Sequence, residues 1–148
     1  MPKSISSIEK SYLAGFLDAD GSVYVQAKPN KTYRFGFQIA PYIVFYQSSK
    51  DADVFSRVCL LIKFGHKRVR KDGIVEYIIS KHNELVLFIN LVEPYVIMKK
   101  KQLNLLKKIL HFKQKVNSAK DFKRLINLID KFRDLNYSKK RKRRTLTL

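Results

Sequence analysis

The sequence predicts an α+β fold in which helices pack on one face of an antiparallel sheet. Segments with apolar residues at helical spacing are interspersed with segments in which apolar and polar residues alternate one by one. Their order is helix, two or three strands, helix, two strands and three helices, which is typical of this class. A chain of 148 residues with 45% hydrophobic residues can bury one core. We therefore expect a single domain over residues 1–137 and a basic tail over 138–148.

The first helix is predicted over residues 6–20. Ser6 and Glu9 have the spacing of a capping box, in which each side chain accepts a backbone amide of the other residue. The apolar face of this helix is formed, at helical spacing, by Leu13, Phe16 and Leu17. Gly21 is well placed to end the helix.

Strands are predicted next. Between Ser22 and Lys28 the apolar side chains alternate with polar ones, and Pro29-Asn30-Lys31 marks a turn. The alternation resumes from Tyr33 to Ala40, and Tyr42–Gln47 continues in extended character. A period of two gives one buried and one exposed face, and the exposed face carries Gln, Lys, Arg and Tyr.

The rest of the chain reads as a helix over about 50–63 ended by Gly65, and a hairpin around Lys71-Asp72-Gly73. His66, Arg68 and Arg70 share one face of this hairpin if it forms. Three further helices are predicted over residues 83–92, 97–113 and 119–135.

The charge of the chain indicates a polyanionic partner. Lys plus Arg is 31 and Asp plus Glu is 12, giving a formal net charge of +19, which opposes compaction through self-repulsion. Nucleic acid is favoured over a membrane surface, because no apolar run approaches the roughly 20 residues that span a bilayer. The start, Met1-Pro2-Lys3-Ser4, also lacks the apolar core of a secretory signal. The basic run Lys139–Arg144 is interpreted as a solvated tail, a nuclear-import-like signal or a phosphate-contacting segment.

Cysteine and histidine chemistry is not indicated. The single cysteine, Cys59, excludes an internal disulfide and a multi-cysteine zinc site, and its apolar neighbours predict a small buried side chain. The three histidines have no metal-ligand spacing.

Two carboxylates at the end of the first helix stand out. Asp18 and Asp20 lie at the negative pole of the helix dipole, where acidic groups are disfavoured by up to about 1 kcal/mol. A divalent cation would compensate, since Mg²⁺ prefers carboxylate and carbonyl oxygens. The two positions are about 200° apart around a helix, so one is expected to be structural and one catalytic. The alternative is that both are ordinary turn residues before Gly21.

Gly15 and Ala19 are four residues apart and share a face of the same helix. Small side chains allow a second backbone to approach closely. The approach could be packing within one chain, or a helix pair across a dimer axis that brings two Asp20 carboxylates together.

The run from Leu13 to Gly21, LAGFLDADG, resembles the LAGLIDADG motif of homing endonucleases. It occurs once, near the N-terminus, which is similar to the homodimeric, single-motif members encoded in organellar introns. The resemblance covers nearly the whole chain, including Lys28-Pro29-Asn30, Gln47 and Leu135-Asn136-Tyr137-Ser138-Lys139. It implies a fold in which motif helices meet at the dimer axis and each subunit's sheet forms a saddle in the DNA major groove.

The resemblance also implies the roles of individual residues. Asp20 of each subunit would bind Mg²⁺ or Mn²⁺, with Ca²⁺ as a non-cleaving substitute, aided by the carbonyl of Ala19. Gln47 and Lys99 would complete the catalytic site, and Asp18 would stabilise the helix end. The implied dimer interface consists of Leu13, Gly15, Phe16 and Ala19. The implied contacts to double-stranded DNA are Tyr24, Gln26, Lys28, Asn30, Tyr33, Arg34, Gln38, Ala40, Val44, Arg68, Arg70, Glu76, Ile78, Asn136, Ser138 and Lys139.

The chain departs from the family pattern at a few positions. Asp51 replaces an expected basic residue, with Lys50 beside it, and the hairpin near Asp72 is one residue longer. Apolar Ala40, Val44 and Ile78 stand at contact positions, where they could meet thymine methyl groups.

The resemblance implies metal-dependent hydrolysis of both DNA strands at a long pseudo-palindromic site, with staggered cuts that leave 3′ overhangs. It also implies an organelle, chloroplast or mitochondrion, as the location and no membrane partner. Two other interpretations stay open: an RNA-binding intron splicing factor (maturase), and a basic ribosome-associated protein. The combination of Asp20, Gln47 and Lys99 favours the nuclease, because neither alternative needs it.

Overall fold

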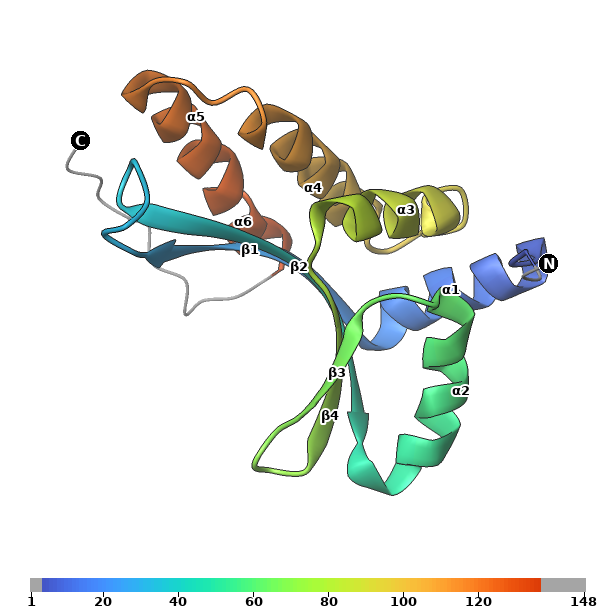
Figure 1. Cartoon of the computed structure of the whole chain (residues 1–148). Helices are drawn as coiled ribbons and strands as arrows, with labels where there is room; N and C mark the ends of the chain where they lie inside the picture. Colours follow the sequence, from blue (N-terminus) through green and yellow to red (C-terminus); the bar gives the residue numbers. More distant parts are fainter. Residues whose placement is uncertain (1–3, 137–148) are drawn as a thin grey trace. The chain divides into compact units, whose positions relative to one another are not determined.

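The computed structural model of the chain describes residues 4–136 (Figure 1). It confirms the α+β class. The elements in chain order are α1 (Ser7–Asp20), β1 (Gly21–Pro29), β2 (Phe37–Ser48), the short 3-10 helix η1 (Ser49–Asp51), α2 (Ala52–Ile62), β3 (His66–Val69), β4 (Ile74–Ile79), α3 (His82–Val92), α4 (Lys100–Lys113), α5 (Ala119–Asp130) and α6 (Phe132–Leu135).

The strands form one four-stranded sheet with the order β1-β2-β4-β3. β4 is antiparallel to both of its neighbours, with Phe45 of β2 opposite Tyr77, and Arg68 of β3 opposite Glu76. This register puts Phe45 and Tyr77 on one face, and Arg68 and Glu76 on the other.

The chain divides into two compact units and passes from one to the other within β1, within β2 and at the start of α4. The described part of unit 1 comprises residues 4–23 and 42–100, and that of unit 2 comprises residues 24–41 and 101–136. Each unit is described by itself below. The expected single domain over residues 1–137 stays a prediction.

The core of unit 1 lies between one face of the sheet and the helices α1, α2 and α3, which lie on the same side of it (Figure 1). The ring of Phe45 is 5.3 Å from that of Phe16 in α1 and 5.8 Å from that of Phe88 in α3. On the neighbouring strand, Tyr77 contacts Phe55 of α2 at 6.5 Å between ring centroids. Burying these rings supplies much of the hydrophobic stabilisation of unit 1, because each large aromatic removes a large apolar area from water.

The core of unit 2 joins α4, α5 and α6 to the β1–β2 hairpin. Val25 and Ala27 of β1 are 1% exposed, as the alternating pattern predicted. The most buried helical side chains of the unit are Leu103, Leu106, Ile109, Leu125, Ile126 and Phe132. Gln102 donates a hydrogen bond to the carbonyl of Leu135 at 3.1 Å, which links the start of α4 to α6.

The ends of α1 confirm the signals in the sequence. Ser6 is the N-cap, and both hydrogen bonds of the capping box with Glu9 are present at 3.1 Å. Gly21 ends the helix by donating its N–H to the carbonyl of Leu17. A Cβ at position 21 would lie 2.8 Å from that carbonyl oxygen, so the close approach requires glycine.

Two predicted boundaries are wrong, and the single helix predicted over residues 119–135 is interrupted at Lys131, between α5 and α6. Residues 33–36 belong to a turn and not to a strand, because the Asn30 side chain accepts two hydrogen bonds from Thr32 and Gly36 has a φ of +79°. The helix predicted from residue 97 starts only at Lys100, because the amides of residues 97–99 turn toward Asp18.

Candidate active site

Asp18 joins the end of α1 to the segment that precedes α4. Its carboxylate accepts three backbone N–H groups, from Ile97 at 2.9 Å, Met98 at 3.1 Å and Lys99 at 3.0 Å. Hydrogen bonds to an ionised acceptor are about twice as strong as neutral ones. The geometry therefore fits the expectation that Asp18 stabilises the helix end.

Asp20 has different surroundings. It is exposed, and its carboxylate accepts a hydrogen bond from the side-chain amide of Gln47 at 3.2 Å. The last turn of α1 contains no basic residue that would pair with this charge. The structure thus brings together Asp20 and Gln47, which are 27 positions apart in the sequence.

Lys99, which directly precedes α4, contacts the last turn of α1. Its ammonium group donates to the backbone carbonyl of Asp18 at 2.7 Å, and the side chain is partly buried. The three residues predicted to be catalytic, Asp20, Gln47 and Lys99, therefore all belong to unit 1 and converge on the C-terminal end of α1.

The face of α1 predicted to contact a second subunit is only partly available. Gly15 and Ala19 are exposed, and a Cβ added at Gly15 would meet nothing within 4 Å. Leu13 is 0% exposed, so its assignment to a dimer interface is wrong. Phe16 turns toward Phe45 and Phe55 of its own chain. The apolar periodicity of α1 identifies the face that packs in the core, whereas the small residues lie on the other face.

The predicted DNA contacts of unit 1 follow the hairpin formed by β3 and β4. Arg68 is exposed and faces Glu76 across the strands. Arg70 forms an ion pair of 2.6 Å with Asp72 and lies 3.9 Å from Glu76. Sequence reasoning missed the role of Asp72, although it lies only two residues from Arg70. The turn carboxylate fixes the direction of this guanidinium group.

Tyr46 lies beside the same acidic residue, opposite Glu76 in the register. Burial and the Glu76 carboxylate raise the pKa of the Tyr46 hydroxyl, and Arg70 opposes this shift. Tyr46 therefore stays a neutral hydrogen-bonding group at ordinary pH.

Two of the apolar contact positions are covered. Val44 and Ile78 lie opposite each other in the register and are 4% and 9% exposed. Burial to this degree counts against a direct thymine contact by either side chain. Ala40 in unit 2 keeps an intermediate exposure, and its contact stays a prediction.

The remaining predicted contacts of unit 2 lie on β1, the turn after it and the start of β2. Gln26, Tyr33 and Arg34 are exposed, whereas Tyr24, Lys28, Asn30 and Gln38 are partly exposed. Asn136 follows α6 and donates its N–H to the carbonyl of Phe132 at 2.9 Å. Ser138, Lys139 and the rest of the predicted tail lie outside the described residues.

The chemistry of the donor set fits a divalent cation only with a contribution from outside the chain. Asp20 supplies one carboxylate, and backbone carbonyls at a helix end, such as that of Ala19, are suitable oxygen ligands. Within residues 4–136, no group of three or more His, Cys, Asp or Glu side chains could hold a metal ion. A second copy that placed its own Asp20 nearby would bring a second carboxylate to the site.

Fold, motif and site together define a LAGLIDADG endonuclease: the profile of that family matches residues 13–110, and the chain belongs to the family. The chain is 35% identical to the DNA endonuclease I-CreI of Chlamydomonas reinhardtii over 136 residues, 88% of this chain and 80% of that protein. It is 28% identical to the DNA endonuclease I-CvuI of Chlorella vulgaris over 111 residues, 75% of this chain and 67% of that protein.

Solved structures show the same fold. The structure of I-CvuI bound to the I-CreI target superposes with a TM-score of 0.85 at 24% identity, covering 91% of this chain and 86% of that one. The archaeal intron-encoded homing endonuclease I-Vdi141I in complex with DNA gives a TM-score of 0.79 at 23% identity, covering 93% and 89%. Among the helices within residues 4–136, none has the length and apolar character that crossing a membrane requires.

Proposed function

We propose that this chain is a homing endonuclease that cuts both strands of a long, pseudo-palindromic DNA site as a homodimer. The observation that carries the proposal is the end of α1, where an exposed Asp20 carboxylate meets Gln47 and Lys99 binds the same helical turn. Family membership supports the chemistry, since the profile that matches the chain is that of an endonuclease. The solved relatives in complex with DNA support the substrate.

The homodimer is inferred from the number of carboxylates. One described chain offers one exposed carboxylate at the site, and no cluster of three metal-ligating side chains occurs among the described residues. The exposed face with Gly15 and Ala19 has room for a second backbone. A two-fold axis through this face would pair the two Asp20 residues and would match an approximately two-fold target.

The proposed cofactor is Mg²⁺, with Mn²⁺ as an alternative and Ca²⁺ as a substitute that supports binding without cleavage. Structures of I-CvuI with DNA in the presence of magnesium or calcium support divalent metal use. The ligands in this chain would be the Asp20 carboxylate and the Ala19 carbonyl. When bound, the metal supplies Lewis-acid stabilisation of charge on the scissile phosphate.

The other residues act on the phosphate and on the water around it. Gln47 holds the Asp20 carboxylate in one orientation and can hydrogen-bond to water beside the phosphodiester. The Lys99 ammonium group, positioned by the Asp18 carbonyl, is a donor that can stabilise charge developing on phosphate oxygens. The strand residues supply sequence choice, while phosphate contacts supply affinity.

The geometry of the products and the location of the protein are further parts of the proposal. We expect staggered cuts that leave short 3′ overhangs, and an organelle, chloroplast or mitochondrion, as the site of action. Both expectations come from the similarity to single-motif homing endonucleases. The maturase and ribosome-associated interpretations gain no support from the contact between Asp20 and Gln47.

The test of the proposed function is the substitution Asp20→Asn. Supercoiled plasmids carrying a library of long target sites are incubated with Mg²⁺, and the linear products are sequenced. We expect Asp20→Asn to lower the cleavage rate about a thousandfold while leaving binding intact, because loss of the metal removes several kcal/mol of transition-state stabilisation. Asp53→Asn, at an exposed carboxylate in the first turn of α2, is the matched control and should cut normally. Undiminished cleavage by Asp20→Asn, or cleavage by the wild type in EDTA, would contradict the proposal.

A further inference from the structure

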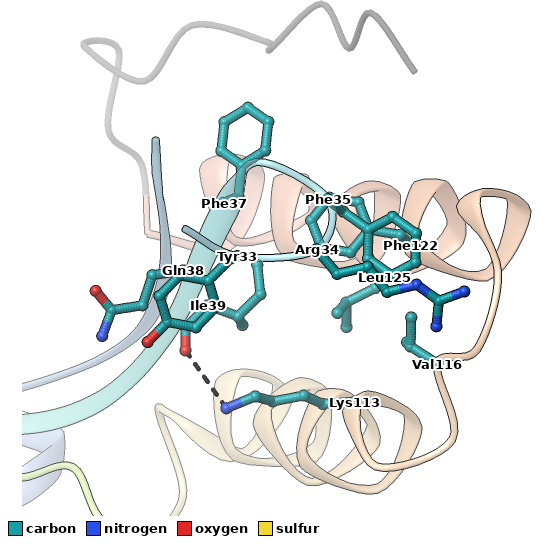
Figure 2. A pocket seen from close by; sticks show the side chains of 10 residues that line it. All are labelled: Tyr33, Arg34, Phe35, Phe37, Gln38, Ile39, Lys113, Val116, Phe122 and Leu125. Atoms are coloured by element: carbon teal, nitrogen blue, oxygen red, sulfur yellow. Dashed lines mark hydrogen bonds between the residues drawn. The ribbon is translucent and has the colours of Figure 1, made fainter. Parts of the chain in front are cut away.

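Unit 2 contains an open cavity whose lining combines three predicted duplex contacts, Tyr33, Arg34 and Gln38, with residues that the duplex-cleavage proposal does not use. Its volume is about 330 Å³, and it lies between the turn after β1, the start of β2 and the helices α4 and α5 (Figure 2). Its aromatic lining consists of Tyr33, Phe35, Phe37 and Phe122, and its cations are Arg34 and Lys113. Pockets that hold small organic groups start at roughly 300 Å³, so the cavity is large enough for one nucleotide.

The aromatic rings present nearly parallel planes. Phe35 and Phe122 stack with centroids 4.9 Å apart and 19° between the planes, and Phe37 lies 6.2 Å from Phe122 at 27°. The guanidinium carbon of Arg34 lies 4.9 Å from the centroid of Phe35. A planar group that entered the cavity could therefore stack on an aromatic ring or on a guanidinium plane.

The lysine of the cavity is positioned by the strand. The Lys113 ammonium donates to the carbonyl of Ile39 at 3.4 Å, a long hydrogen bond that uses one of its three donor protons (Figure 2). Burial lowers the pKa of Lys113, which means that its charge is partly desolvated. An anionic group beside it would compensate for this desolvation.

Ordinary core packing explains the cluster only in part. Phe122 is 3% exposed, and its stacking on Phe35 packs α5 against the turn after β1. The cavity beside it is open to solvent, however, and two cations, Arg34 and Lys113, line it. The combination of aromatic planes, cations and free volume favours a planar anion as the occupant.

We propose that this cavity binds one unpaired nucleotide of a single-stranded nucleic acid, with the base on the aromatic rings and the phosphate at Arg34 and Lys113. A base inside a duplex is already stacked on its neighbours, so only an unstacked base can use an aromatic platform. A strand is favoured over a free nucleotide by the net charge of +19 and by the exposed Lys115, Lys120 and Lys123 of the same unit. The proposal goes beyond duplex cleavage and does not depend on Asp20.

The test measures the binding of fluorescein-labelled U₁₀ and dT₁₀ by anisotropy in EDTA, so that it reports binding whether or not the chain cuts duplexes. Tyr33 and Arg34 are also predicted duplex contacts, so the variant is placed at Lys113. We expect Lys113→Gln to weaken binding about tenfold, since a charge-assisted contact is lost. Lys113→Arg should restore most of the affinity. Lys108→Gln, at an exposed lysine of the same helix that does not line the cavity, is the matched control and should bind like the wild type.

Competition and cross-linking complete the test. Unlabelled U₁₀ should displace the probe, whereas free UMP at the same nucleotide concentration should not. An oligonucleotide containing 4-thiouracil should cross-link to residues of the cavity, identified by mass spectrometry. Wild-type affinity in Lys113→Gln, equal displacement by UMP, or cross-links confined to other parts of the chain would each overturn the proposal.

Discussion

Asp18 and Asp20 are two residues apart, yet their contacts assign them to different tasks. Asp18 accepts hydrogen bonds from the three backbone amides of residues 97–99, whereas the Asp20 carboxylate accepts one from the side chain of Gln47. A carboxylate held by three N–H groups is engaged in structure, and an exposed carboxylate at the negative end of a helix is available for a cation.

The first prediction separates the two residues by stability. Asp18→Asn should lower the free energy of unfolding by about 2–3 kcal/mol, because an amide offers one acceptor oxygen and no charge to the three N–H groups. Asp20→Asn should change it by less than about 0.5 kcal/mol, since removing a charge from a helix C-terminus is slightly favourable. Urea titrations followed by circular dichroism measure both values. Equal losses in the two variants would show that the carboxylates are not divided in this way.

A second prediction concerns Tyr77, whose hydroxyl donates to the carbonyl of Phe64. Burial, followed by the nearby Cys59 and Glu84, raises the pKa of Tyr77 to about 12. The folded pKa lies above the ordinary value of about 10, so the neutral phenol contributes stability that is fully present below pH 10. This contribution should be lost as the pH rises through about 12.

The measurement is the free energy of unfolding of the wild type and of Tyr77→Phe between about pH 9 and pH 12. The wild type should lose stability more steeply, since its unfolded state releases the phenolic proton first. Parallel curves for the two proteins would show that Tyr77 titrates as it does in the unfolded chain.

At the scale of elements, α1 divides its surface between its own core and an open face. Leu13 and Leu17 are 0% exposed, while Gly15 is exposed with free space around its Cβ position. Substitution of Gly15 should therefore leave the fold of the chain intact and act only on a partner that lies against this face.

The third prediction follows from the free space beside the Cα of Gly15. Gly15→Ala should stabilise the helix by about 0.8–1 kcal/mol through its better helix propensity. Gly15→Leu should shift the proposed homodimer to monomer and abolish the proposed cleavage, because its side chain would occupy the space of a second backbone. Sedimentation velocity measures the oligomer, and Asn90→Leu, on an exposed position of α3, is the control. A Gly15→Leu protein that remains dimeric and cuts DNA would place the dimer axis on another surface.

The elements were predictable where the signal is local. The Ser6–Glu9 box, Gly21 and the alternation of β1 involve neighbours in the chain, and they gave the right boundaries. The turn at residues 33–36 was missed because Asn30 side-chain bonds and the positive φ of Gly36 override the alternation. The late start of α4 was missed because its cause, Asp18, lies 79 to 81 positions away.

The candidate site was predictable only in part. The family resemblance selected Asp20, Gln47 and Lys99, which the structure brings to one helix end. Periodicity could not distinguish a residue that packs in its own chain from one that meets a partner, which explains the wrong assignment of Leu13. A period of two gives the face of a strand but not how far neighbours cover it, and Val44 and Ile78 illustrate this limit. The residues next to Lys113 in the sequence do not indicate a binding site, because the residues that surround it in the fold come from three separate segments.

At the scale of the whole molecule, the excess of 19 positive charges favours a polyanionic partner, while single residues determine the reaction. Such a charge attracts any polyanion and raises association rates, but it does not distinguish duplex from single strand or DNA from RNA. Discrimination must come from the strand faces for duplex DNA and, in our proposal, from the aromatic cavity of unit 2 for an unpaired base.

The most direct test of the central claim is a crystal structure of the complex with a target duplex and Mn²⁺, using anomalous scattering to locate the metal. The account predicts anomalous peaks between the Asp20 carboxylates of two copies, next to the DNA backbone. Peaks at other side chains, or Asp20 carboxylates that lie far from each other and from the phosphates, would contradict it.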